Sequence, residues 1–171
     1  TLRFALLSAQ YRSELTFSSD LLEQAKSALD SLYASLRGVS SVEAIRPNNL
    51  AEHPVYLALL DDLNTPVAIR ELHQLAKAMM QTTGDKQARL KGLLLACAEL
   101  MGLLQQSPEA WFQSAVKDDA IDNEAIEALI QARDEAKLAK DYARADAIRN
   151  QLSEAGVQLQ DGQNGTTWRR G

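Results

Sequence analysis

The sequence contains few residues of the kinds that build disulfides, metal sites or redox sites. It has one cysteine, Cys97, and two histidines, His53 and His73, among 171 residues. One cysteine cannot close an internal disulfide, and a reducing cytoplasm is the expected location. These few soft ligands do not make a structural zinc site, so we assign no metal ligand. We interpret Cys97 as a small core residue and His73 as a partly buried structural residue.

Long apolar runs and common catalytic motifs are missing as well. The run from Leu93 to Ala98 is far shorter than the roughly 20 apolar residues that a membrane span needs, and no secretory signal is recognisable. No glycine-rich phosphate loop, GxSxG elbow, HExxH pair or CxxC pair occurs. The neighbouring Asp61 and Asp62 point apart and are interpreted as helix-end residues, so we assign no catalytic residue. The sequence starts with Thr1 rather than Met, which predicts a fragment.

The composition favours helices and a locally arranged binding surface. Ala, Leu, Glu, Lys and Arg are frequent, whereas there are only eight glycines and four prolines. The net charge is −5, from 18 basic and 23 acidic residues. Such a charge argues against binding nucleic acid through a basic field over the whole molecule. Any contact with nucleic acid must therefore come from a few well-placed side chains.

Apolar periodicity predicts a helical bundle over residues 1–122. One helix is expected from Ser18 or Ser19 to Gly38, because its apolar residues recur every three or four positions. Further helices are expected over residues 55–60, from an N-cap at Thr65, and from Pro108. The inward residues of the last two long helices are predicted to be Ile69, Leu72, Ala76 and Met79, then Leu90, Leu93, Cys97, Leu100 and Leu104.

A second, small domain is predicted over residues 123–171, after a polar and acidic stretch at 114–123. Residues 125–140 and 142–155 are expected to form two helices with Asp141 as the cap between them, and Gly156 ends the second. Residues 157–160 and 166–170 then flank a turn and predict a β-hairpin. The expected fold is mainly α: a helical bundle followed by a small α-hairpin plus β-hairpin domain.

Basic side chains recur in the predicted helical hairpin at spacings of four, three and four. They are Arg133, Lys137, Lys140 and Arg144. Tyr142 and Asp146 are four residues apart and share one face of a helix. Cations beside an aromatic ring and a carboxylate can hold phosphates, stack one base and read another. Spacing alone favours the alternative, a salt-bridged surface hairpin, because acidic residues lie between the basic ones.

Several motifs, in the right order, resemble the C-terminal part of bacterial cysteinyl-tRNA synthetases. The family typically shows a leading segment like residues 2–8, a DDFNTP-like turn and a GTTWRR-like ending. The corresponding segments here are LRFALLS at 2–8, DDLNTP at 61–66, KDY at 140–142 with AD at 145–146, and GTTWRR at 165–170. The resemblance covers essentially the whole chain.

The resemblance implies a fragment of a class I ligase, with a DALR-type bundle and an anticodon-binding domain. Family members charge cysteine tRNA using ATP, magnesium and one zinc ion in a Rossmann-type domain whose HIGH-like and KMSKS-like motifs are missing here. No cofactor is expected in this chain. The implied partner is cysteine tRNA with its GCA anticodon, bound by a monomer. No binding to DNA or to a membrane is expected.

The resemblance also implies which residues contact the tRNA. Asp146, Tyr142 and Lys137 match anticodon-binding positions, although the family often has Trp at the second and Arg at the third. Lys137 cannot make the planar two-donor contact of Arg. Weaker backbone contacts are expected from Arg133, Lys140, Arg144, Arg169 and Arg170, and Trp168 is expected in the core. The alternative is a protein-interaction module, because residues 133–152 also resemble a UVR-type helical hairpin.

Overall fold

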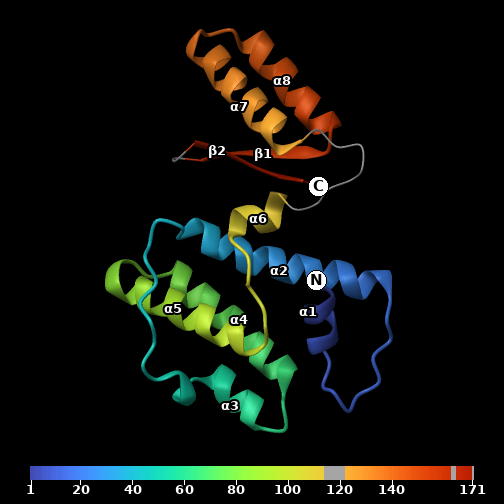
Figure 1. Ribbon diagram of the computed structural model, residues 1–171, viewed down its shortest axis with the longest axis vertical. Coiled ribbons are helices and arrows are strands. Elements are labelled where there is room, and N and C mark those ends of the chain that lie inside the picture. The colour runs from blue at the N-terminus through green and yellow to red at the C-terminus, as the bar shows by residue number, and fades with distance from the viewer. Residues whose placement is uncertain (114–121, 163–164, 171) are drawn as a thin grey trace. The chain divides into compact units, whose positions relative to one another are not determined.

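The computed structural model describes residues 1–113, 122–162 and 165–170. The chain divides into two compact units, Thr1–Pro108 and Glu109–Gly171, which are described separately (Figure 1). Most of the predicted boundary stretch at 114–123 lies outside the described residues. The expected mainly α fold with a small β-hairpin is confirmed.

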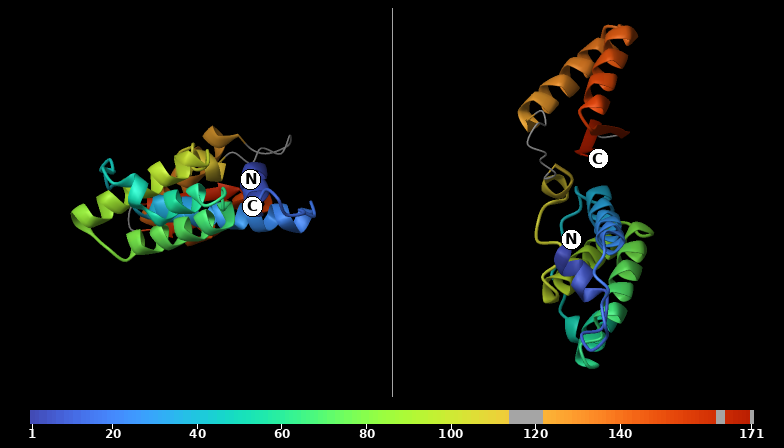
Figure 2. Two further views of the ribbon diagram at one scale, coloured as in Figure 1. Left: turned by 90° about the horizontal axis from the view of Figure 1, so that it is seen from below. Right: turned by 90° about the vertical axis from the view of Figure 1, so that its right-hand side faces the viewer.

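The first unit is a bundle in which α4 and α5 lie side by side, and α2 and α3 pack against α4 (Figure 2). Helix α1 packs against α2. The bounds are α1 Leu2–Leu7, α2 Ser19–Gly38, the 3-10 turn η1 Leu50–Glu52, α3 Pro54–Leu60, α4 Thr65–Met80 and α5 Gly84–Leu100. The short α6, Pro108–Gln113, follows.

The predicted N-cap of α2 is confirmed, and that of α4 is not. Ser18 caps α2, since its side chain accepts a hydrogen bond from Leu21 N at 3.2 Å. The predicted cap of α4 at Thr65 is wrong, because Asn64 Oδ1 accepts from Val67 N instead. The Thr65 hydroxyl donates to the carbonyl oxygen of Ala9 at 3.3 Å, a tertiary contact that local sequence does not show.

The inward face of α4 is confirmed, whereas that of α5 is shifted. The four predicted residues of α4 are all buried. On α5, Leu100 is exposed because the helix ends there and the chain turns away at Met101. The buried residues of α5 are Ala88, Gly92, Leu94, Cys97 and Ala98. Within the described ranges, no helix has both the length and the apolar character needed to cross a membrane.

Cys97 is buried in this core, as predicted, and its Sγ lies 3.7 Å from His53 Nδ1. Burial raises the pKa of the Cys97 thiol from its ordinary value to about 11. Because the thiolate is the reactive form, we expect a maleimide at pH 8 to label the folded chain about a hundredfold more slowly than the urea-unfolded chain. Mass spectrometry of samples quenched at successive times measures both rates. Equal rates would show that the thiol is accessible.

The second unit places a helical hairpin on a two-stranded sheet. Its helices are α7, Asn123–Leu138, and α8, Tyr142–Glu154, and its antiparallel strands are β1, Val157–Gly162, and β2, Gly165–Arg170. Asp141 caps α8 as predicted, since its side chain accepts from Arg144 N at 3.1 Å. Gly156 ends the helical region with a φ of 75°, a conformation that glycine adopts without strain.

The core of this unit lies between the helices and the hairpin. Trp168 is buried there, which confirms its predicted place, and its Nε1 donates to Glu127 Oε1 at 2.7 Å. The other buried members of the cluster are Ile126, Ile130, Ile148, Leu152 and Val157. The apolar stripes of both helices therefore face the sheet of the same unit.

Candidate nucleic-acid interface

Three of the predicted site residues lie in the helix turns on either side of the connection between α7 and α8. Lys137 lies in the last turn of α7, Tyr142 is the first residue of α8, and Asp146 follows one turn later. Lys140 adopts a φ of 59° in the connection, which reverses the chain. Tyr142 has an exposed fraction of 64%, and Asp146 is exposed as well. An aromatic ring, a carboxylate and an ammonium group are thus available to solvent at one end of the hairpin.

Asp161 at the end of β1 connects the hairpin to α7. Its carboxylate accepts two hydrogen bonds from Arg133, from Nη1 at 3.0 Å and from Nη2 at 2.9 Å. The hydroxyl of Thr166 donates to Asp161 Oδ1 at 2.8 Å, and Lys137 Nζ lies 3.4 Å from Oδ2. A bidentate arginine–carboxylate pair is a strong and geometrically specific charge-assisted contact. It fixes the position of the strand ends relative to the last turns of α7.

Asp161 and Arg133 each stabilise the charged form of the other. Hydrogen bonds from Arg133 and then Thr166 hold the pKa of Asp161 well below its usual range. The same contact with Asp161 raises the pKa of Arg133. Both groups are therefore ionised at neutral pH, and Lys137 has a fixed negative partner that restricts where its ammonium group lies.

The predicted basic residues do not form one exposed row. Arg133 is only 5% exposed and is committed to Asp161. Lys140 lies in the turn, and Arg144 lies on α8 with its side chain exposed. The structure thus leaves Lys140 and Arg144 facing solvent and uses Arg133 inside the unit.

The two C-terminal arginines also differ, because alternate residues of a strand face opposite sides. Arg169 is exposed, and its guanidinium donates to Gln158 Oε1 at 2.8 and 3.0 Å. Arg170 is buried, donates to Asn123 Oδ1 at 2.9 Å, and lies 5.7 Å from the centre of the Trp168 ring. Arg169 can meet a phosphate, while Arg170 ties β2 to the start of α7.

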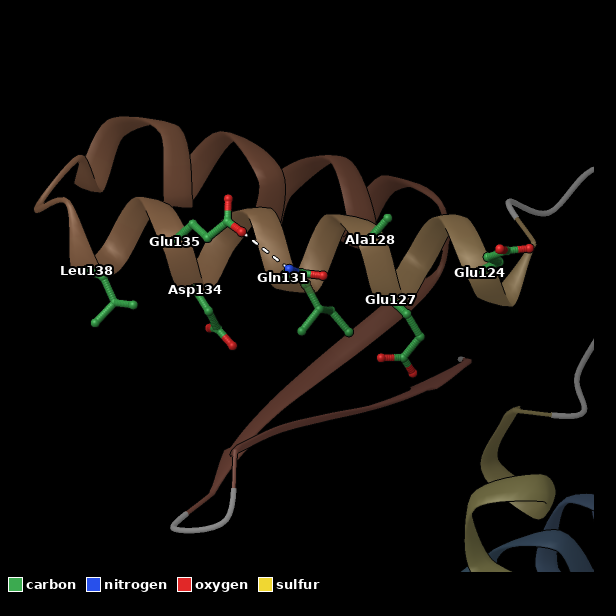
Figure 3. A pocket seen from close by; sticks show the side chains of 8 residues that line it. Glu124, Glu127, Ala128, Gln131, Asp134, Glu135 and Leu138 are labelled. Atoms are coloured by element: carbon green, nitrogen blue, oxygen red, sulfur yellow. Dashed lines mark hydrogen bonds between the residues drawn. The ribbon is translucent and has the colours of Figure 1, made fainter.

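A second surface of this unit is acidic. It is a hollow along α7 whose lining includes four carboxylates (Figure 3). Its lining includes Glu124, Glu127, Gln131, Asp134, Glu135 and Leu138. Clustered carboxylates repel the phosphates of a nucleic acid. This hollow is therefore poorly suited to contact phosphates.

Among the described residues, no three His, Cys, Asp or Glu side chains gather closely enough to hold a metal ion. The pair His53 and Cys97 offers two ligand types, but burial raises the pKa of the Cys97 thiol, which opposes formation of the thiolate that zinc binds. Within the described part of the chain, this pair has no third ligand beside it.

Sequence reasoning misses Asp161 and Thr166, because it places them in or beside a turn. Both belong to paired strands, and the register sets them directly opposite each other. An aspartate two residues after a partly buried strand position, facing a threonine across a hairpin, is the available signal. It cannot show that Arg133, 28 positions earlier, completes the site.

Comparison with known proteins matches two domain families in this chain. Residues 123–169 match the cysteinyl-tRNA ligase anticodon binding domain, and residues 54–105 match the DALR domain. The chain is 51% identical to a cysteine–tRNA ligase of Saccharophagus degradans and 47% identical to one of Paramagnetospirillum magneticum. Each match covers 99% of this chain and 37% of the relative.

A cysteine–tRNA ligase of Xanthomonas campestris pv. campestris is 47% identical, over 99% of this chain and 36% of the relative. The chain thus spans little more than a third of the length of these relatives, and the matched third is their C-terminal part. The resemblance seen in the sequence motifs is confirmed. By its two matched domains and by these relatives, the chain belongs to the cysteine–tRNA ligase family as a C-terminal part of such a protein.

Proposed function

We propose that this chain binds cysteine tRNA and that its small domain, residues 123–171, reads the GCA anticodon. The observation that supports the proposal is the placement of Lys137 in the last turn of α7 and of the exposed Tyr142 and Asp146 in the first turns of α8, on either side of the hairpin connection. The family match to an anticodon binding domain over 123–169 supports the same assignment. The bundle, residues 1–122, then holds the body of the tRNA.

Each of the three side chains suits one part of anticodon recognition. The exposed ring of Tyr142 stacks on an unpaired base, which every base permits because each has a π-face. The Asp146 carboxylate accepts a hydrogen bond from a base amino or imino group. Lys137 supplies a point charge to a phosphate or a base oxygen, and Asp161 holds it in place.

Backbone contacts in this proposal come from the cations that remain exposed. Lys140, Arg144 and Arg169 face solvent. Lys140 and Arg144 lie within two residues of Tyr142 in the sequence, whereas Arg169 lies on β2 opposite Gln158. Arg133 and Arg170 do not contact the tRNA in this proposal, because their side chains hold the strands against α7. Phosphate contacts set the register of a nucleic acid without reading its sequence.

In the whole ligase we propose that this part positions the tRNA for a reaction carried out elsewhere in the polypeptide. That reaction joins cysteine to the 3′ end of the tRNA with ATP and magnesium, and its zinc ion selects the thiol. We propose that all of these are bound by a part of the polypeptide outside this chain. We further propose that the protein works as a cytoplasmic monomer.

The alternative, a UVR-like module that pairs with a second protein hairpin, has weaker support. Such a module needs an apolar stripe on its helices for the partner. Here Ile126, Ile130, Ile148 and Leu152 are buried against Val157 and Trp168 of the same unit. The stripe is already covered by the β-hairpin.

A titration with tRNA tests the proposal. At one fixed, moderate salt concentration, we expect the chain to bind cysteine tRNA more tightly than the same tRNA with one anticodon base changed. The substitution Asp146→Asn keeps the shape of the side chain and should reduce this preference about 5- to 150-fold, the equivalent of about 1–3 kcal/mol for a good base contact. Fluorescence anisotropy measures both affinities.

Glu154→Gln is the matched control, because it removes an exposed charge of the same sign at the other end of α8. It should leave the preference unchanged. Equal, salt-sensitive binding to both tRNAs would mean that the chain contacts only the phosphate backbone and does not read the anticodon. If Asp146→Asn unfolds the small unit, as read by circular dichroism, Asp146 is a structural residue and the assignment is wrong.

A further inference from the structure

The first unit presents a row of leucines that its own core does not use. Leu57, Leu60 and Leu63 have exposed fractions of 51%, 68% and 57%. Leu57 and Leu60 are three residues apart on α3 and share a face, and Leu63 lies in the turn that follows. Neighbouring large apolar side chains exposed to this degree are typical of an interaction surface. We call these three residues the leucine row.

The turn that carries Leu63 has an unusual backbone. Asp62 and Leu63 both adopt a φ of 51°, in the left-handed region that a leucine rarely occupies. Each such residue costs roughly 1–3 kcal/mol and persists where surrounding structure enforces it, most often at functional sites. The chain therefore accepts strain at a position whose side chain is left in solvent.

The segment after α1 enforces this turn. The Tyr11 hydroxyl donates to Asp62 Oδ1 at 2.8 Å, and Gln10 Nε2 and Arg12 Nη2 donate to the same carboxylate at 3.3 Å. The Thr65 hydroxyl donates to the Ala9 carbonyl oxygen. Residues 9–12 and the α3–α4 turn are thus held together. Helix α1, which leads into this segment, has two further leucines that are more than half exposed, at positions 2 and 6.

We infer that the leucine row is the surface on which the preceding part of the ligase polypeptide docks. In the Saccharophagus degradans relative the match covers 37% of the protein, at its C-terminal side, so most of that polypeptide precedes the counterpart of α1. A part joined to α1 reaches the leucine row at high effective concentration, because residues 9–12 bind the turn next to it. The inference depends on the family membership and not on the reading of an anticodon.

The chemistry of the row defines the surface that fits it. The docked part offers an apolar patch to the three leucines and a lysine or arginine to the exposed Asp61 carboxylate. Asp62 is already satisfied by its three donors and serves to hold the turn. The leucine row is thereby positioned before docking, which lowers the entropy cost of association.

Hydrogen exchange tests the inference on two proteins. One is this chain alone, and the other joins it to the N-terminal part of the Saccharophagus degradans relative. We expect amides of residues 60–65 to exchange about tenfold more slowly in the joined polypeptide, because docking stabilises the turn. Equal rates in both proteins would overturn the inference. Protection that grows with the concentration of the chain alone, with a dimer in sedimentation, would assign the row to a second copy and overturn it as well.

A double substitution, L60Q with L63Q, supplies the second measurement. The protection seen in the joined polypeptide should be lost, while the unfolding midpoint of the chain alone stays the same because both side chains are exposed. Leu138→Gln is the matched control, since Leu138 is an exposed leucine of the other unit and should change neither result. Retained protection in the double variant, or a lower midpoint of the chain alone, would contradict the inference. The double substitution should leave the anticodon preference unchanged. A failure of this test is therefore distinguishable from a failure of the proposed function.

Discussion

Replacing Asp161 with asparagine is expected to lower the free energy of unfolding of the small unit by about 2 kcal/mol at pH 7. The substitution keeps the size of the side chain but removes the charge that Arg133 needs. Arg133 is 5% exposed and donates two hydrogen bonds to this carboxylate, so its own charge is left in a poorly hydrated place. The expected loss is smaller than for a fully buried pair, because the Asp161 side chain is 54% exposed.

The effect of Asp161→Asn should depend on pH in a defined direction. Arg133 holds the pKa of Asp161 below its usual value of 3.8, so the carboxylate binds protons less readily in the folded state. Its contribution to stability is complete above the usual carboxyl pKa and declines as the pH falls below about 4. Urea unfolding of both proteins between pH 7 and pH 2, followed by circular dichroism, should show the difference between them shrinking on the acid side.

Asp134→Asn provides the control for the loss of an acidic residue beside Arg133. Its Oδ1 lies 4.0 Å from Arg133 Nη1, at the limit of an ion pair, and its side chain is half exposed. This substitution should cost less than about 0.5 kcal/mol. Equal losses in the two variants would mean that the general negative charge near Arg133, and not the bidentate pair, stabilises the unit.

The same network explains which part of the candidate site is predictable from the sequence. Tyr142 and Asp146 are four residues apart on one helix, and that spacing alone places them together. The cap at Asp141 and the stop at Gly156 follow from local backbone chemistry in the same way. Features that depend on neighbours within one helical turn can therefore be predicted from the amino-acid sequence alone.

The features that sequence reasoning misses depend on contacts between distant segments. Arg133 resembles one of four surface cations, but its side chain is taken up by Asp161 of a strand 28 residues later. Thr65 resembles a helix cap, but its hydroxyl bonds to Ala9, and Asn64 takes the cap. In both cases several roles suit the residue type, and only the tertiary partner decides among them.

The largest stability effect in the bundle is expected from Gly92→Ala. A Cβ at this position would overlap the carbonyl oxygen of Ile45 and lie 2.7 Å from its carbonyl carbon, both backbone atoms. The Ile45 segment cannot easily retreat. Ile45 N donates to the Ala88 carbonyl oxygen at 3.0 Å, and Lys91 Nζ donates to the carbonyl oxygens of Val39 and Val42 at 2.9 and 2.7 Å.

Movement of this segment would cost more than an ordinary overpacked side chain, which loses about 1–3 kcal/mol. The gain in helix propensity from glycine to alanine, about 1 kcal/mol, offsets only part of the loss. We therefore expect the free energy of unfolding of the bundle to fall by about 3 kcal/mol, measured by urea titration. The Gly92 position is thus set by the backbone of residues 39–45 and not by the apolar periodicity of α5.

Gly38→Ala separates this steric cause from a general effect of glycine replacement. Gly38 is also in a helix, but its added Cβ would meet the terminal methyl group of Met80 at 3.0 Å, the mobile end of a flexible side chain. Met80 can change rotamer, so this variant should stay within about 1 kcal/mol of the original protein. If Gly92→Ala is equally mild, residues 39–45 are not held against α5 in solution, and the bonds from Lys91 do not fix them there. If only Gly92→Ala is destabilising, the close approach of two backbones at this glycine is part of what holds the bundle together.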